Sequence, residues 1–132
     1  MDSFSGCSDL ARGVLPNERE RALALVKKLP PSIRVGAYDF EIEQWHANKA
    51  AGARRWGECS CTEMRISIQQ DMPCRVQTVH TLVHEINHAV WWAFGVEDED
   101  KEERTVNLSA NGWTCVYRDN PWLLDWLKEA VA

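Results

Sequence analysis

The sequence has no long apolar run, no excess of basic residues and only four histidines. A membrane-spanning helix needs about 18 or more consecutive apolar residues, so we expect no membrane partner. The 15 Lys and Arg residues are outnumbered by 20 Asp and Glu residues, which gives a formal net charge of −5. Because so acidic a chain is poorly suited to bind a phosphate backbone by charge, we do not expect a nucleic-acid partner.

The cysteines also lack a recognisable pattern. There are five of them, so they cannot all pair within one chain, and none forms a C-x-x-C motif. The segment from Met1 to Gly13 lacks the basic and apolar regions of a secretory signal. We therefore expect reduced thiols and a cytoplasmic protein. Cys59 and Cys61 alternate on an expected strand and, with Cys74, are interpreted as small buried residues rather than a second metal site.

The length and composition predict one globular domain. A chain of 132 residues, 45% hydrophobic and 27% charged, has the composition of an ordinary folded protein. We expect residues 1–16 to form a flexible arm and residues 17–132 to form a single domain. Seven tryptophans are many for this length, and core packing is the expected role of most of them.

The first half of the domain is predicted to contain one helix and a small sheet. Leu23, Leu25, Val26 and Leu29 predict a helix over residues 17–29, with Asn17 as its cap. Alternating apolar residues predict a hairpin over 33–44, followed by a loop over 46–55 and strands over 56–62 and 64–69. We expect the segment 65–69 to be a candidate edge strand, to which an extended peptide could add.

The second half is predicted to be helical. Apolar residues recur every three or four positions over 75–94, which indicates an amphipathic helix that ends at Gly95. A further helix, opening at Glu103, is expected after an acidic run over 97–103, and Asn120-Pro121 is expected to cap and begin the last helix. The fold class is therefore α+β: an N-terminal helix, a small antiparallel or mixed sheet, the 75–94 helix and two C-terminal helices.

The 75–94 helix contains the motif His84-Glu85-Ile86-Asn87-His88, which is H-E-x-x-H. Residues four apart on a helix project from the same face one turn apart, so both imidazoles can bind one metal ion. Glu85 is rotated about 100° around the helix, and from there it can reach a water molecule on that metal. His80 lies one turn before His84, and we interpret it as a residue of the surrounding cleft, because only the 84–88 pair encloses a glutamate.

A catalytic zinc has three protein ligands and one open position. The extended metzincin pattern would require Gly at 91 and His at 94, where this chain has Trp91 and Phe94. We select Glu103 as the third ligand, because Asn107 follows one turn later and could orient a ligating histidine. Glu102 and Glu97 remain the alternatives.

The spacing of these residues resembles a known family. His84-Glu85-x-x-His88, followed after fourteen residues by Glu103-x-x-Val106-Asn107-x-x-Ala110, resembles the gluzincin type of zinc metallopeptidase. The short sheet before Thr81-Leu82-Val83-His84-Glu85 resembles the compact ImmA/IrrE-like domains of bacteria and phages. This resemblance implies a minimal zincin-like domain, although Val106 stands where the family often has Ala.

We therefore predict a zinc-dependent metallopeptidase with one Zn²⁺, bound by His84, His88 and Glu103, in which Glu85 is the general base. Its partner would be a peptide or protein substrate. Tyr38 and Tyr117 are further candidates for stabilising an oxyanion. One alternative is a zinc-binding regulatory module with little turnover. The other is a nucleic-acid-associated protease of the SprT-like kind, which the net charge disfavours. The sequence leaves the oligomeric state open.

Overall fold

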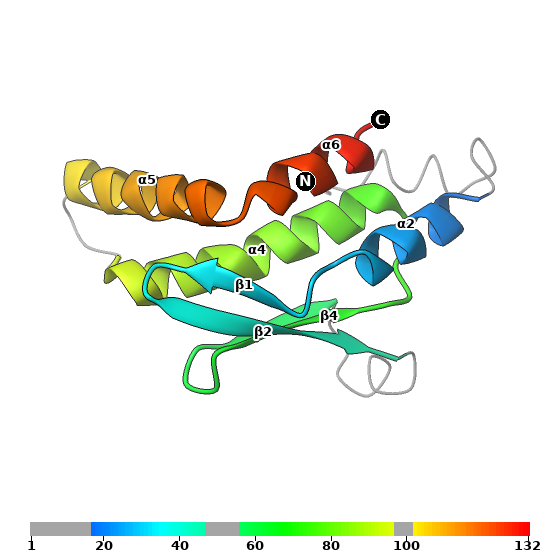
Figure 1. Ribbon diagram of the computed structural model, residues 1–132, viewed down its shortest axis with the longest axis horizontal. Coiled ribbons are helices and arrows are strands. Elements are labelled where there is room, and N and C mark those ends of the chain that lie inside the picture. The colour runs from blue at the N-terminus through cyan, green and yellow to red at the C-terminus, as the bar shows by residue number, and fades with distance from the viewer. Residues whose placement is uncertain (1–16, 47–55, 97–101) are drawn as a thin grey trace.

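The computed structural model describes residues 17–46, 56–96 and 102–132, without the side chains of Glu102, Glu103 and Val106. Three of the expectations above lie outside this part of the chain. They concern the arm over 1–16, most of the 46–55 loop and the acidic run as far as 101. The order of elements is helix, four strands and three helices (Figure 1): α2 (Glu18–Lys27), β1 (Ser32–Val35), β2 (Tyr38–Trp45), β3 (Gly57–Ser60), β4 (Arg65–Gln69), α4 (Arg75–Phe94), α5 (Glu102–Asp119) and α6 (Pro121–Ala130).

The four strands form one mixed sheet in the order β1-β2-β4-β3. β1 and β2 form the predicted antiparallel hairpin, joined by a two-residue turn in which Gly36 has φ +61. β2 pairs with β4 in parallel, and β3 pairs with β4 antiparallel. The expectation that 65–69 is an edge strand is therefore wrong, because β2 and β3 occupy both sides of β4. The described sheet instead has β1 and β3 at its edges.

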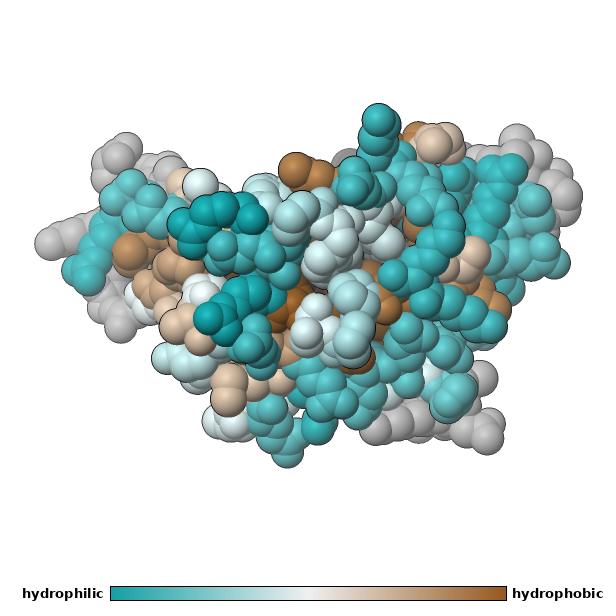
Figure 2. Space-filling view, viewed as in Figure 1, coloured by the Kyte–Doolittle hydropathy of each residue, from teal (hydrophilic) through white to brown (hydrophobic). Residues whose placement is uncertain are grey.

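The hydrophobic core lies between the helices and one face of the sheet. Phe40, Ile66 and Ile68 from the sheet and Leu82 and Ile86 from α4 are all fully buried. Figure 1 shows α4 lying between the sheet and the α5–α6 pair. The face that carries the β1–β2 hairpin in the foreground is mostly hydrophilic, with apolar surface in small patches (Figure 2). The α+β class is thus confirmed, and α4 is the central element.

The predicted first helix is confirmed as α2, but its contacts differ from those expected. Asn17 occupies the N-cap position without a side-chain cap hydrogen bond. Glu18 instead reaches the start of α4, where its carboxylate accepts hydrogen bonds from the backbone N–H of Arg75 at 3.1 Å and from Nε of Arg75 at 2.7 Å. Burial raises the pKa of Glu18, but the hydrogen bonds and charge of Arg75 outweigh burial and lower that pKa overall.

The end of α4 and its packing against α5 each depend on a glycine. Gly95 adopts a left-handed conformation with φ +64 and ends α4 as predicted. Gly112 lies inside α5, where glycine costs about 1 kcal/mol relative to alanine. A Cβ at Gly112 would lie 2.5 Å from Cγ1 of Val90 on α4. The glycine therefore permits the close approach of the two helices.

Asn120 has a different role from the predicted cap. It precedes Pro121 at the start of α6, but its side chain makes no cap hydrogen bond. Its amide accepts a hydrogen bond from the backbone N–H of Arg34 at 3.0 Å and donates to the carbonyl of Arg34 at 2.7 Å. These two bonds satisfy backbone groups at the open edge of β1, so Asn120 joins the helices to the sheet.

The tryptophans differ from one another in burial, and the cysteines differ in whether they form a disulfide. Trp45 and Trp126 are buried, whereas Trp56 and Trp92 are exposed. Cys59, Cys61 and Cys115 are free thiols, whereas Cys74 is disulfide-bonded, so the expectation of fully reduced thiols is wrong. None of the described helices is both long and apolar enough to cross a bilayer.

Candidate metal centre

The helix α4 places the H-E-x-x-H side chains at the boundary between its buried and exposed faces. His84 and His88 are exposed, while Glu85 is 8% exposed and Ile86 is fully buried. The imidazoles therefore face solvent together, and the carboxylate between them in sequence is turned toward the protein. This division follows from the helical period, because residue 85 is rotated about 100° from residue 84.

The two imidazoles are spaced as a metal pair would be. Their Nε2 atoms lie 3.2 Å apart, and their ring centroids are separated by 4.9 Å. Two nitrogens that bind one tetrahedral Zn²⁺ at about 2.0–2.1 Å lie about 3.3–3.4 Å apart. The observed separation fits this value closely, and other divalent cations with similar bond lengths fit equally well. Without a cation, the same separation allows one imidazole to donate an N–H to the other.

A carboxylate oxygen of Glu85 completes the group. Ligand atoms of His84, Glu85 and His88 all lie within 4.8 Å of one another, and these residues could hold a metal ion. Among the described residues, this is the one group of three or more His, Cys, Asp or Glu side chains with such spacing. It consists of the three residues that the motif predicted.

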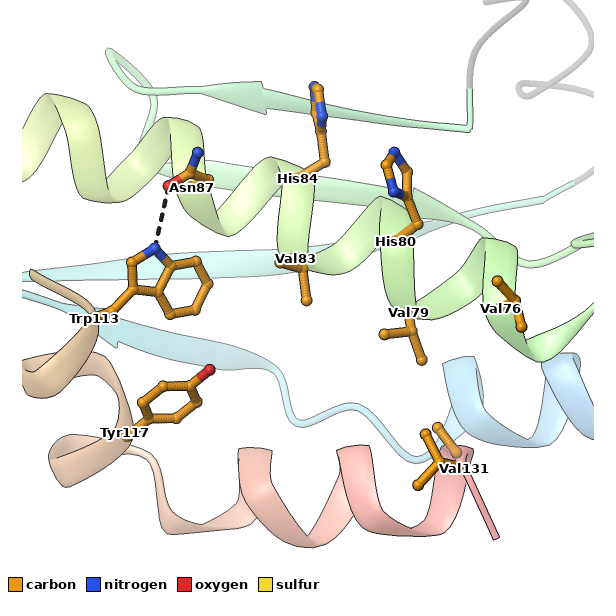
Figure 3. Close-up of a pocket in the computed structure, with 10 residues that line it drawn as sticks. Val76, Val79, His80, Val83, His84, Asn87, Trp113, Tyr117 and Val131 are labelled. Atoms are coloured by element: carbon orange, nitrogen blue, oxygen red, sulfur yellow. Dashed lines mark hydrogen bonds between the residues drawn. The ribbon is translucent and has the colours of Figure 1, made fainter. Parts of the chain in front are cut away.

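His80 lies next to this group without belonging to it. Its ring centroid is 5.9 Å from that of His84, and the side chain is exposed. The close nitrogen pair is therefore His84 with His88 rather than His80 with His84. His80 and His84 rise from neighbouring turns of α4 (Figure 3), so His80 lies at the border of the site.

Strand β3 lies directly against Glu85. A Cβ on Gly57 would be 2.7 Å from Cγ2 of Thr81, 2.8 Å from the carbonyl oxygen of Ser67 and 3.3 Å from Cγ of Glu85. Only glycine allows β3 to approach α4 this closely. Thr81 is itself fixed, because its hydroxyl accepts a hydrogen bond from the amide of Gln77 at 3.0 Å and donates to the Gln77 carbonyl at 2.8 Å. The edge strand thus covers and orients the buried carboxylate.

A second contact joins the motif to α5. The indole N–H of Trp113 donates a hydrogen bond to Oδ1 of Asn87 at 3.1 Å (Figure 3). Asn87 occupies one of the two variable positions of H-E-x-x-H. The bond fixes α5 against α4 one turn from His84, and it holds the indole beside the metal group.

Two thiols lie next to the candidate centre. The Sγ atoms of Cys59 and Cys61 are 3.8 Å apart, and Sγ of Cys61 lies 3.9 Å from the carbonyl oxygen of His88. Burial, with smaller contributions from Cys61, Glu85 and Glu58, raises the pKa of Cys59 to about 12. Cys59 therefore stays a neutral thiol at physiological pH. Both cysteines are half-buried rather than buried as predicted, and of the two only Cys59 packs against the core.

The third ligand is not located by the structure. The backbone of Glu103 lies in the first turn of α5, but its side chain and that of Glu102 are outside the described set, and Glu97 lies outside the described residues altogether. Asn107 is exposed on the next turn of α5. The assignments of Glu103 as a ligand and of Asn107 as its partner therefore stay predictions.

An apolar groove begins beside the histidines. It has a volume of about 800 Å³ and lies between α4, α5 and α6, with His80 and His84 among its lining residues. Figure 3 shows Val79 and Val83 projecting from α4 into the space that Tyr117 and Val131 border on the other side. Tyr117, predicted as a candidate for oxyanion stabilisation, lines this groove, whereas Tyr38 packs on Trp92 with ring centroids 4.8 Å apart.

Sequence reasoning did not identify three parts of the site: Gly57, the Asn87–Trp113 bond and the groove. The sequence carries a weak signal only for Gly57, since a glycine that begins a strand indicates a close backbone approach. The two other features depend on α5 lying against α4. Comparisons with models of protein families, with curated proteins and with solved structures found no match to this chain.

Proposed function

We propose that this protein is a zinc-dependent metallopeptidase. The observation that carries the proposal is the 3.2 Å separation of the His84 and His88 Nε2 atoms beside the carboxylate of Glu85. Two imidazoles with one glutamate carboxylate as the third ligand suit Zn²⁺, which prefers nitrogen and oxygen ligands in tetrahedral sites. Glu103, one turn before Asn107 on α5, is the proposed third ligand, which leaves one coordination position open.

The chemistry would be divided between the metal and Glu85. A bound zinc ion supplies a Lewis acid and a water molecule of lowered pKa. Glu85 is next to the two ligands in space, and β3 packs against its side chain at Gly57. Glu85 is thus placed to accept the proton of the attacking water and to return it to the leaving amine. Helix α4, which carries His84 and His88, is itself packed against β3 at Gly57 and bonded to α5 through Trp113.

The open edge of β3 gives the peptide a place to bind. β3 is an edge strand of the described sheet and packs on α4 at Glu85. A peptide in extended conformation could add to this edge through backbone hydrogen bonds. Its carbonyl groups would then pass over the histidine face of α4. The expected peptide-binding strand is therefore β3 rather than β4.

The decisive experiment separates metal binding from hydrolysis. Zinc content is measured by plasma mass spectrometry on purified wild type and on the His84→Ala, His88→Ala and Glu85→Gln variants. We expect one zinc ion per chain in wild type and in Glu85→Gln, and loss of zinc in both histidine variants. In a peptide library, wild type should cleave in a chelator-sensitive manner, and Glu85→Gln should be slower by at least about 100-fold.

His80→Ala is the matched control, because His80 lies on the same helix but outside the metal group. It should retain its zinc. If Glu85→Gln kept full activity with zinc bound, the proposed mechanism would be wrong. If wild type bound zinc but cleaved no peptide, the protein would instead be a zinc-binding module without turnover.

A further inference from the structure

The groove between α4, α5 and α6 is lined mainly by apolar side chains. Val79 and Val83 form its α4 wall, Trp113 and Tyr117 form its α5 wall, and Val131 closes its far side. The lining includes no carboxylate, ammonium or guanidinium group. A charged ligand group placed against the valines, away from His80 and His84, would lose its water without gaining a charged partner. The chemistry of the groove therefore selects apolar groups.

The dimensions of the groove suit several side chains rather than one. Its volume is about 800 Å³, which lies in the upper part of the ~300–1,000 Å³ range of ligand pockets. Lining residues on α4 extend from Val76 to Asn87, a span of about 16 Å at the helical rise of ~1.5 Å per residue. An extended peptide covers this span with about five residues, of which alternate ones face the same way. Two or three side chains of such a peptide can therefore enter the groove.

The groove is continuous with the candidate metal centre. His84 belongs both to the metal group and to the groove lining. In Figure 3, the histidines rise from one side of α4 and the valines project from the other, along the same two turns. The Asn87–Trp113 hydrogen bond ties the groove wall to the motif itself. A ligand whose reacting carbonyl lies at the histidines would therefore enter the groove beside His84, with side chains that pass around α4.

We propose that this groove binds two or three apolar side chains of the substrate peptide, on one side of the bond that is cleaved. The proposal rests on the metallopeptidase function and names its substrate class: peptides with a cluster of aliphatic or aromatic residues next to the scissile bond. Trp113 and Tyr117 are specificity-determining residues, since they form the wall that faces α4. The edge of β3 would hold the peptide backbone on the sheet side of α4, and the groove would select the side chains that pass around α4 at His84.

The test compares an apolar-to-aspartate substitution inside the groove with one on a helix outside it. Val83→Asp places a charge in the groove, whereas Leu124→Asp places one on α6 at an apolar residue that is 54% exposed and does not line the groove. Each is made in the Glu85→Gln background and loaded with zinc. Binding is measured by fluorescence polarisation of a labelled peptide that carries Leu at alternate positions, and of its counterpart with Asp at those positions. Tyr117→Asp, at an exposed groove residue, serves as the second groove variant.

We expect the Leu peptide to bind at least about 10-fold more tightly than the Asp peptide, within the 10–200-fold range that apolar pockets achieve. Val83→Asp and Tyr117→Asp should remove this preference, and Leu124→Asp should keep it. Circular dichroism identifies any variant that does not fold. The proposal is overturned if the groove variants bind both peptides as the parent does. It is also overturned if these variants change only the oligomeric state, measured by sedimentation, because the groove would then be an interface between copies of the chain.

The outcome for the groove and the outcome for the function can be distinguished. Cleavage sites mapped in a peptide library with wild-type protein should show apolar residues on one side of the cut. Cleavage without that preference would refute the groove proposal and leave the peptidase function standing. Conversely, apolar peptide binding that depends on Val83, combined with no cleavage by wild type, would support the groove and refute the peptidase function.

Discussion

Gly57 on β3 and Glu85 on α4 are in such close contact that a Cβ on residue 57 would lie 3.3 Å from Cγ of the glutamate. The same Cβ would lie still closer to Thr81 and to the backbone of Ser67, at 2.7 and 2.8 Å. Backbone cannot yield to the added carbon as a flexible side chain can. Because Ser67 lies on β4 and Thr81 on α4, strand β3 must shift relative to both neighbours when residue 57 carries a side chain.

Gly57→Ala should consequently disturb both stability and the site. We expect a loss of about 1–3 kcal/mol in the free energy of unfolding, which is typical of overpacking in a core. Peptide cleavage should fall by more than stability explains, because Glu85 loses the strand that confines it. Urea denaturation and kcat/KM measure the two effects. Ser60→Ala, on the same strand, is the control, and equal effects of the two substitutions would contradict the assignment.

The Glu18–Arg75 pair should make stability depend on pH in the acidic range. Because Arg75 lowers the pKa of Glu18 below its ordinary 4.5, the pair stabilises the fold at neutral pH. That contribution is lost as the pH falls through the lowered pKa and Glu18 becomes protonated. Glu18→Gln should therefore cost about 1.5–3 kcal/mol at pH 7, as expected for a hydrogen bond to a charged group.

The difference between wild type and Glu18→Gln should shrink in urea denaturation as the pH falls through and below the lowered pKa of Glu18, because both side chains are then neutral. Glu20→Gln changes an exposed acid on the same turn of α2 and should have little effect at either pH. A difference that stayed constant from neutral to acidic pH would show that the pair does not titrate as described.

The elements with a strong local period were predictable from the sequence. The helix over 75–94 and its end at Gly95 are confirmed, because apolar residues every three or four positions and a left-handed glycine are local signals. The hairpin is confirmed for the same reason. The pairing of β4 was wrong, because the order of strands depends on where the chain goes between β2 and β3. Alternation within Arg65–Gln69 is the same in an edge strand and in an inner one.

The site was predictable only where its residues are close in sequence. The His84, Glu85 and His88 group follows from a spacing of four on one helix, and the structure brings these atoms together. Gly57 lies 28 residues from Glu85, and Trp113 lies 26 residues from Asn87. Such contacts arise from packing between elements, which no local spacing encodes. Asn120 is the N-cap residue of α6 as predicted, but its amide bonds to Arg34, a tertiary contact that no local spacing encodes.

The third ligand can be identified by comparing neighbouring glutamates on α5. Glu103→Ala should lower zinc affinity more than the ~10–100-fold that loss of an outer-shell partner causes. Glu102→Ala is the matched control, because it removes the same charge from the adjacent position. Affinity is measured by competition with a chromophoric chelator. Unchanged affinity in Glu103→Ala, with a loss in Glu102→Ala or Glu97→Ala, would move the ligand to that residue.

Cys59 should make the fold sensitive to alkaline pH. Its thiol has a pKa of about 12 instead of the ordinary 9.0, chiefly because burial disfavours the thiolate. The unfolded chain therefore releases this proton at lower pH than the folded protein does, and stability falls as the pH rises above 9 toward 12. Cys59→Ala should reduce that fall when melting temperatures at about pH 8 and about pH 10.5 are compared, whereas Cys115→Ala, at a half-buried free thiol on α5, should not.

The same burial predicts that Cys59 reacts slowly with iodoacetamide in the folded protein, because the thiolate is the nucleophile. Rapid alkylation of Cys59 at about pH 8, mapped by mass spectrometry, would contradict a raised pKa.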